Sequence, residues 1–354
     1  MTVVESQKTV RETFIDVLKV VSILGIITIH SNVPGLFNSP IGSFSWLTSA
    51  FLGSMVRFSV PVFFMCSGAL LLDPQKELTI GKIYGKYLLR AFIALFVWAS
   101  AYEAFDLFRA VYPSGRLELV MIKDALLRVL KFKHHYHLYF LHIMLLFYAL
   151  LPIARVFVKN ASETEYRYLL IFWFLLGIVY PSVRGYYPFS ELTGIPAQYG
   201  INTTYSALGY GLLGYYIKTH KPEKIWIPRL TYLIGFALTF GCFTVFSIVS
   251  GKIAVAFWEG MLPFVFLMAV GLFGAAATRQ NKPVPKIIGT VARSTMCVYL
   301  VHEFFLMLLK IIGLSSAVFL PLISVPLVTW IVFGISFCVY LLLRKIPWVN
   351  RYLI

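Results

Sequence analysis

Long apolar stretches separated by short polar segments run along the whole chain. A helix that crosses a bilayer needs about 20 mostly apolar residues, and ten stretches approach or exceed this length. Their bounds are 13–32, 47–72, 83–108, 136–158, 168–183, 204–218, 230–249, 254–277, 292–312 and 318–343. The sixth is short and rich in glycine. The pattern predicts an all-α polytopic membrane protein with about ten transmembrane helices in a single domain, residues 1–354.

The longest connection, residues 109–135, has a different pattern. Its apolar side chains recur at helical spacing and basic side chains stand between them. The apolar positions are Leu119, Ile122, Leu126, Leu127 and Leu130, and the basic ones are Lys123, Arg128 and Lys131. A basic amphipathic helix of this kind is typical of the membrane interface, and we expect one here.

Composition and charge agree with a membrane protein. Hydrophobic residues make up 59% of the chain and charged residues 13%, against roughly 25% charged in soluble domains. The net charge of +16 does not indicate a nucleic-acid partner, because no basic tail or stripe stands clear of the apolar stretches. With a cytoplasmic N-terminus, 20 of the 31 Lys and Arg residues fall in inner segments and nine in outer ones. This bias predicts that both termini are cytoplasmic.

The four cysteines all lie inside apolar stretches and share no metal-binding or disulfide spacing. We interpret them as buried apolar residues, with a catalytic thiol at Cys66 as the alternative. The first apolar stretch contains Asp16 and Lys19 and lacks a small-residue cleavage site, so it is interpreted as a retained helix.

Three ionisable residues lie in the first predicted span. Eleven residues separate Lys19 from His30, which places them on one helical face about 16 Å apart along the axis. Asp16 lies one turn from Lys19, a spacing that allows an ion pair. Ionisable groups within a membrane are usually functional. Asp16, Lys19 and His30 thus form a polar stripe along one face of the predicted helix. This stripe either lines a substrate path or has a purely structural role inside the bundle.

The second predicted span contains Arg57, followed by Pro61 and by Ser67-Gly68. We expect Pro61 to interrupt the helix and the small pair to allow close packing. An intramembrane cation needs a carboxylate or an anionic ligand. The candidate partners are Glu103, Asp106 and Glu259.

Four histidines occur in nine residues at the start of the fourth span: His134, His135, His137 and His142. Their spacing does not match a helical metal motif, and we predict no metal site. A polar and aromatic girdle at the interface is one interpretation, and a role of His137 at a substrate site is the other.

The ninth span carries Tyr299 and His302, which are three residues apart and share a helical face. Glu303 follows directly, and a rotation of about 100° per residue predicts that it points elsewhere. A buried structural histidine and a second functional histidine remain alternatives for His302.

These segments together resemble the acyltransferase-3 family of integral membrane acyltransferases, with a closer resemblance to the branch typified by the enterobacterial-common-antigen O-acetyltransferase. Asp16, Lys19 and His30 match an Asp-x-x-Arg-x10-His motif. Residues 57–68 match an Arg-x-Ser-Val-Pro-x-Phe-Phe-Met-x-Ser-Gly block. The remaining matches are His137-Leu138-Tyr139-Phe140 and the set Ser294, Tyr299 and His302. The chain departs from the family at Lys19, because lysine lacks the planar fork of arginine.

The resemblance implies transfer of an acyl group, commonly acetyl, from cytoplasmic acyl-CoA to a hydroxyl of an extracytoplasmic glycan or related acceptor. It implies a multi-pass protein of a bacterial plasma membrane, surrounded by lipid and without a permanently bound cofactor. Such chemistry needs a base for the hydroxyl proton and donors for the oxyanion. His30 is the expected base, and the candidate donors are Arg57, Tyr299 and His302.

Further residues receive expected binding roles. The CoA phosphates are assigned to Lys82, Lys86 and Arg90, which lie on the predicted inner side. Lys19 is expected to hold the pantetheine arm or to pair with Asp16. The expected substrate-binding residues are His137, Tyr139, Glu103 and Glu259. Direct transfer is favoured over an acyl-enzyme on His30 or Cys66. The alternative function is a transporter or flippase, for which we find no internal repeat.

Overall fold

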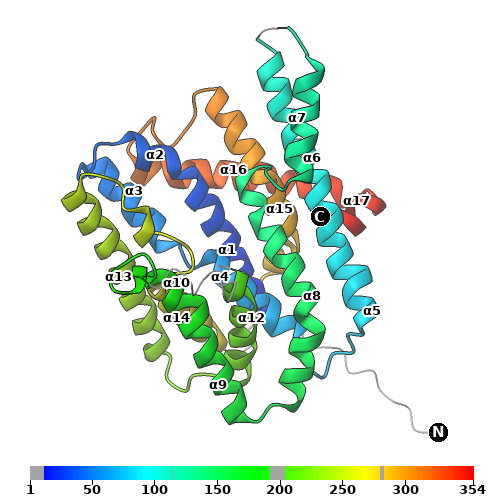
Figure 1. Ribbon diagram of the computed structural model, residues 1–354, viewed down its shortest axis with the longest axis vertical. Helices are drawn as coiled ribbons and strands as arrows, with labels where there is room; N and C mark the ends of the chain where they lie inside the picture. The colour runs from blue at the N-terminus through cyan, green and yellow to red at the C-terminus, as the bar shows by residue number, and fades with distance from the viewer. Residues whose placement is uncertain (1–11, 114, 192–203, 280–282) are drawn as a thin grey trace.

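The computed structural model describes residues 12–113, 115–191, 204–279 and 283–354. These residues form helices and connecting segments and no strand, so the predicted all-α class is confirmed. Figure 1 shows a bundle of long helices, with α6 and α7 extending above the rest.

The described residues form α-helices and, in addition, five short segments of 3-10 or π-helix, labelled η. The α-helices are α1 Thr13–Ser31, α2 Val33–Asn38, α3 Phe44–Met55, α4 Ser59–Leu71, α5 Ile80–Lys82, α6 Leu89–Val111, α7 Leu119–Leu130, α8 Tyr139–Asn160, α9 Glu163–Phe174, α10 Tyr180–Val183, α12 Thr204–Thr219, α13 Trp226–Ser250, α14 Pro263–Ala277, α15 Lys286–Ile311, α16 Pro321–Leu343 and α17 Pro347–Tyr352. The η segments are η1 Ile83–Leu88, η2 Tyr136–Leu138, η3 Leu175–Val179, η4 Phe189–Glu191 and η5 Val255–Phe257.

Eight helical segments within the described residues are long and apolar enough to cross a membrane, whereas the sequence predicted about ten. Two of the predicted spans, α12 and α14, are helices of only 16 and 15 residues. The predicted eighth span starts too early. Its first residues form the η5 turn, and Pro263 begins α14 because proline fits the first helical turn.

The predicted second span is broken into α3 and α4, and Arg57 lies in the break. Pro61 is the third residue of α4, where its missing N–H removes no helical hydrogen bond. The predicted interruption is therefore confirmed, although the chain leaves the helix before the proline. The break places the charged side chain of Arg57 at mid-span, between the end of α3 and the start of α4.

The centre of the bundle is α1, which packs against α4, α14, α15 and α16. α4 and α12 approach so closely that a Cβ on Gly68 would overlap the Gly211 carbonyl. A Cβ on Gly214 would likewise overlap the main chain of Met65. The close packing expected at Ser67-Gly68 is thus confirmed.

α7 confirms the helix predicted within the connection 109–135. It packs on α6, burying Ala125 and Val129, while Leu126 and Leu130 stay exposed. The Arg128 Nε donates to a carboxylate oxygen of Glu103 at 2.7 Å. Glu103 therefore pairs with α7 rather than with Arg57. Glu103 does not line the cavity described in the next subsection, and its expected substrate-binding role stays a prediction.

Candidate active site

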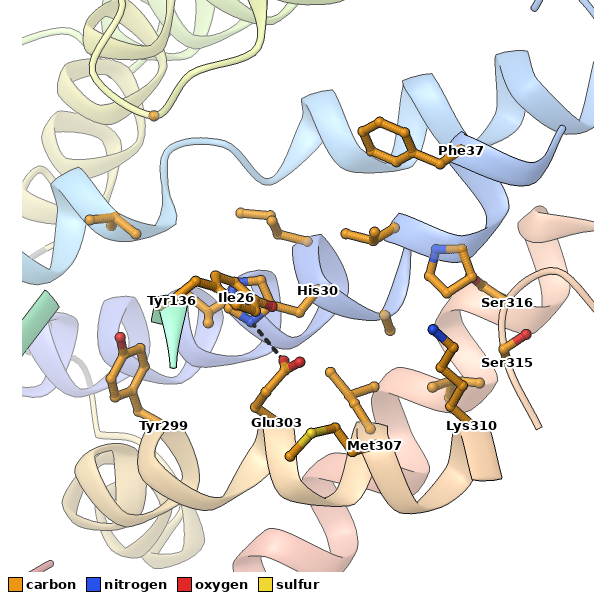
Figure 2. A pocket seen from close by; sticks show the side chains of 18 of the residues that line it. Ile26, His30, Phe37, Tyr136, Tyr299, Glu303, Met307, Lys310, Ser315 and Ser316 are labelled. Atoms are coloured by element: carbon orange, nitrogen blue, oxygen red, sulfur yellow. Dashed lines mark ion pairs between the residues drawn. The ribbon is translucent and has the colours of Figure 1, made fainter. Parts of the chain in front are cut away.

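A cavity of about 980 Å³ opens between α1, α8, α15 and the connections before α4 and α14. Aromatic rings make up much of its wall, among them Tyr136, Tyr139, Phe140 and Tyr299. Its ionisable lining residues, apart from the tyrosines, are His30, Arg57, Arg109, Glu259, Glu303 and Lys310. Figure 2 shows His30 from α1 facing Glu303 from α15 across this cavity, with Lys310 further along α15.

His30 and His302 form the centre of the site. The His302 Nδ1 lies 2.6 Å from the Tyr299 carbonyl oxygen, so this nitrogen carries the proton and donates to it. The unprotonated Nε2 of His302 then accepts from Nδ1–H of His30 at 2.7 Å. The chain of bonds assigns a lone pair to Nε2 of His30. That nitrogen is the one a base would use.

Glu303 is a functional candidate to which the sequence assigned no role. Its Oε2 lies 3.6 Å from Nδ1 of His30, and its side chain is 12% exposed. The prediction that Glu303 points away is wrong because it used only the rotation from His302. Glu303 is four residues after Tyr299, a spacing that also shares a face. A carboxylate inside a span was itself a signal of function.

His30, His302 and Glu303 offer three possible metal-ligand atoms within 4.8 Å of one another. Two imidazole nitrogens bound to one tetrahedral zinc at about 2.05 Å would lie about 3.3 Å apart. The observed 2.7 Å between the two imidazoles is the length of a hydrogen bond. The geometry therefore fits a proton-transfer site better than a metal centre.

Arg57 does not pair with the predicted carboxylates. Glu103 binds Arg128, and Asp106 lies 3.4 Å from Arg109. Instead, the guanidinium carbon lies over the Trp258 ring, 3.5 Å from its centroid. Glu259 lines the same cavity, and its expected substrate-binding role stays a prediction. Arg57 thus presents a positive charge to the cavity.

Residues 12–343 match the acyltransferase-3 family, described as an acyltransferase domain. The chain belongs to the acyltransferase-3 family. The match extends from the residue before α1 to the last residue of α16 and includes the whole cavity lining. The comparison with curated proteins gives no match, and neither does the comparison with solved structures.

The motifs of this acyltransferase-3 protein meet at the cavity to different degrees. His30, Arg57, Tyr139 and Tyr299 line it. His302 lies behind His30, with its ring stacked on the His30 ring at 5.0 Å. The Tyr299 hydroxyl donates to the main-chain carbonyl of His137. This bond occupies the hydroxyl proton that the oxyanion role would need.

The four clustered histidines of the acyltransferase-3 domain form two pairs. His134 and His142 stack with their Nε2 atoms 2.9 Å apart, and the Nδ1 atoms of His135 and His137 are also 2.9 Å apart. His137 is fully buried and lies behind Tyr299 rather than in the cavity lining. Burial lowers the pKa of His135, which keeps this histidine neutral at pH 7.

The predicted inner stripe of α1 is half-buried at Asp16 and Lys19. Both residues lie outside the cavity lining, so their predicted roles remain predictions. Arg155 and Lys218 lie at the C-terminal end of α4. Arg155 donates to the carbonyls of Leu71, Asp73 and Lys76, and Lys218 lies 3.4 Å from the Asp73 carboxylate.

The predicted CoA-binding residues are not at the cavity. Lys82 and Lys86 are exposed, and Arg90 is half-buried; all three belong to the segment α5–η1–α6 on the flank of the bundle. Figure 1 shows α5 at the right flank of the bundle, below the α6–α7 tip and toward the opposite end of the molecule. Their expected role would require CoA to approach from that end.

Proposed function

We propose that this acyltransferase-3 protein transfers an acetyl group from acetyl-CoA, bound from the cytoplasmic side, to a hydroxyl of an extracytoplasmic glycan. The observation that carries the proposal is the unprotonated Nε2 of His30, directed by the bond from its Nδ1 to His302. The cavity supplies a base, a nearby carboxylate and a cation. These are the groups that acyl transfer to an alcohol requires.

The proposed reaction begins when Nε2 of His30 takes the proton of the acceptor hydroxyl. The oxygen attacks the thioester carbonyl carbon, and the guanidinium of Arg57 stabilises the resulting oxyanion. The C–S bond then breaks, the carbonyl re-forms, and the imidazolium returns its proton to the CoA thiolate. Glu303 stabilises the imidazolium between these two transfers, while the hydrogen bond to His302 holds the ring in position.

Direct transfer is favoured over an acyl-enzyme. Cys66 is fully buried in the core formed by α1 and α4 and does not line the cavity. His30 could carry an acyl group only on Nε2, the atom needed as the base. A single displacement needs only His30, its two neighbours His302 and Glu303, and Arg57, and it leaves His30 in its starting state.

The finer assignments belong to the same proposal. We propose a bacterial plasma membrane as the location, cell-surface polysaccharide as the acceptor, and the enterobacterial-common-antigen O-acetyltransferase branch as the subfamily. CoA binding by Lys82, Lys86 and Arg90 is also proposed, supported by their charge and their position away from the α6–α7 tip. Removal of the gene, followed by mass spectrometry of surface glycans, should reveal the loss of one acetyl mass.

The function is tested by following radiolabelled acetyl-CoA in membranes that contain the protein and its native glycans. His30→Ala should lower label transfer by about 10²–10⁴-fold, the range for loss of a general base. His220→Ala is the matched control, because His220 is exposed and lies outside the cavity. Undiminished transfer by a folded His30→Ala variant would contradict the proposal. Solute flux through liposomes without acyl transfer would instead favour a transporter.

A further inference from the structure

Three stacked aromatic rings stand behind Arg57. The rings of Trp46 and Phe243 lie 5.5 Å apart with 17° between their planes, and those of Phe243 and Trp258 lie 4.7 Å apart with 16° between them. Arg57 covers the next face of Trp258. All three rings are at most 4% exposed. The three rings and the Arg57 guanidinium, which come from separate segments, thus form one continuous stack. The stack ends with the guanidinium at the cavity wall.

The Trp258 ring is also fixed within its own plane. Its indole N–H donates to the Ser54 hydroxyl at 2.9 Å. Gly53 makes room for the ring, because a Cβ at this position would overlap its six-membered part. Trp258 directly follows the short η5 segment and is not part of a long helix. The hydrogen bond to Ser54 and the close fit against Gly53 therefore restrain its ring.

A ring face holds an arginine differently from a carboxylate. A cation–π contact is worth about 2 kcal/mol or more when the pair is desolvated, yet the ring adds no negative charge. The Nε of Arg57 is buried and has no hydrogen-bond partner among the described residues. The positive charge therefore remains available to an anion that forms in the cavity.

We propose that Trp258 is a positioning residue that holds the Arg57 guanidinium at the cavity wall without neutralising it. Phe243 and Trp46 support the ring from behind. The proposal rests on the proposed function, since the anion served by Arg57 is the oxyanion of acyl transfer. It assigns a role in the reaction to a residue that the sequence pattern did not mark.

Kinetics of Trp258→Leu provide the main experiment. We expect kcat for acetyl transfer to fall about 10–100-fold, by the loss of oriented charge, while KM for acetyl-CoA changes less than about twofold. Trp258→Phe, which keeps a ring face, should recover most of the rate. In an Arg57→Ala background, Trp258→Leu should cause no further loss. Equal losses in both backgrounds would overturn the positioning role.

Two further measurements test the proposal even if Trp258→Leu folds poorly. Gly53→Ala should lower kcat in the same way by displacing the ring, whereas Trp330→Leu, a change at an exposed position, should not. In protein labelled with 5-fluorotryptophan, the ¹⁹F resonance lost in Trp258→Phe should shift in Arg57→Leu. An unmoved resonance overturns the contact. Absence of acyl transfer by the wild type refutes the proposed function, and the assigned role falls with it.

A second observation concerns the outside of the bundle. A groove of about 600 Å³ runs between α1, α13 and α14. Its walls are mostly apolar and include Phe14, Val17, Val21, Leu233 and Leu272. Because the three helices would lie within the bilayer, the groove would be open to lipid chains.

Two arginines stand at one end of this groove. Arg229 lies near the start of α13, and Arg279 follows the end of α14, beside the start of α1. Both are exposed, and neither forms an ion pair within the part of the chain that the structure describes. The charge distribution predicts that this end is cytoplasmic, where the leaflet is anionic.

We infer that the groove binds one anionic phospholipid of the inner leaflet, with an acyl chain along the apolar walls and its phosphate between Arg229 and Arg279. Basic pockets between membrane helices on the cytoplasmic side bind such headgroups. The apolar groove and the two cations together match a molecule that combines a chain with a negative headgroup.

Native mass spectrometry with phosphatidylglycerol and phosphatidylcholine tests this site. The wild type should retain one phosphatidylglycerol in preference to phosphatidylcholine, and Arg229→Gln/Arg279→Gln should lower that occupancy about tenfold. Lys345→Gln/Arg351→Gln removes the same charge at another exposed place and should leave it unchanged. Equal retention of both lipids overturns the proposal. Displacement of phosphatidylglycerol by free CoA also overturns it, since the site would then serve a nucleotide.

Discussion

At the scale of single residues, the chemistry depends on the protonation of one imidazole. Nδ1 of His30 has two neighbours, the Nε2 of His302 at 2.7 Å and the carboxylate of Glu303 at 3.6 Å. His302 fixes which nitrogen carries the proton in the resting state. Glu303 favours the charged state that follows proton transfer. The two neighbours therefore act at different stages of the proposed reaction.

Glu303→Gln should separate these stages. Glutamine keeps the size of the side chain but removes the charge that stabilises the imidazolium. We expect kcat to fall on the order of 10–100-fold, with KM for acetyl-CoA nearly unchanged. The measurement is steady-state transfer of labelled acetyl groups by the purified variant.

Glu223→Gln provides the comparison, because Glu223 is an exposed residue of the connection between α12 and α13. It should leave the rate within about twofold, as expected for a change at an exposed surface position. If Glu303→Gln behaves like this control, the carboxylate has no part in the reaction and His302 alone would support His30.

The sequence identified most of the polar site but not its supporting residues. His30, Arg57, Tyr299 and His302 were found because charges and histidines inside apolar stretches are unusual. Trp258 was missed because the predicted eighth span, residues 254–277, placed it inside an apolar helix, whereas it lies in the connection before α14. The pairing of Glu103 with Arg128 was missed as well, since it depends on α7 folding back onto α6. Such contacts depend on tertiary packing and not on local spacing.

At the scale of elements, two close approaches shape the site. The break between α3 and α4 brings Arg57 to the cavity, and the glycine contact between α4 and α12 fixes the position of α4. The sequence predicted both features from Pro61 and Gly68. It did not predict where the chain leaves the helix, because a proline in the first turn tolerates several starting points.

Gly68→Ala should destabilise the bundle. The added methyl group would overlap the main chain of Gly211, so the two helices must separate, and overpacking of this kind costs about 1–3 kcal/mol. Gly241→Ala is the matched control, because a Cβ there meets nothing within 4 Å. The midpoint of thermal unfolding in detergent should fall for Gly68→Ala and stay level or rise for Gly241→Ala. A fall of equal size in both would contradict the tight crossing.

Arg128→Ala should loosen the α6–α7 hairpin. It leaves the carboxylate of Glu103, which is 7% exposed, without its cation, and loss of a hydrogen bond to a charged group costs about 1.5–3 kcal/mol. Hydrogen exchange of α7 should accelerate at least about tenfold, since a factor of ten corresponds to about 1.4 kcal/mol. Lys123→Ala, at an exposed position of the same helix, should have little effect. Equal exchange in the two variants would show that the pair does not hold the hairpin.

At the scale of the whole molecule, the charge distribution and the bundle must agree on one orientation. Basic residues favour the cytoplasmic side of short loops, yet six of the nine basic residues predicted outside lie in the connection 109–135. The structure gives a reason for the exception. Arg128 of α7 binds Glu103 of α6, whereas Arg109 binds Asp106 within α6 itself. The charge of Arg128 therefore stabilises the hairpin and does not determine orientation.

The orientation can be measured with single cysteines in a background where the four native cysteines are alanine. Lys123→Cys lies on α7 and Glu223→Cys in the connection between α12 and α13, both at exposed positions. We expect an impermeant thiol reagent to label the first in intact cells and the second only after the cells are permeabilised. The reverse pattern would place both termini outside. It would also put the Arg229 and Arg279 end of the groove in the outer leaflet, so one labelling experiment tests the orientation on which both the donor side and the lipid site depend.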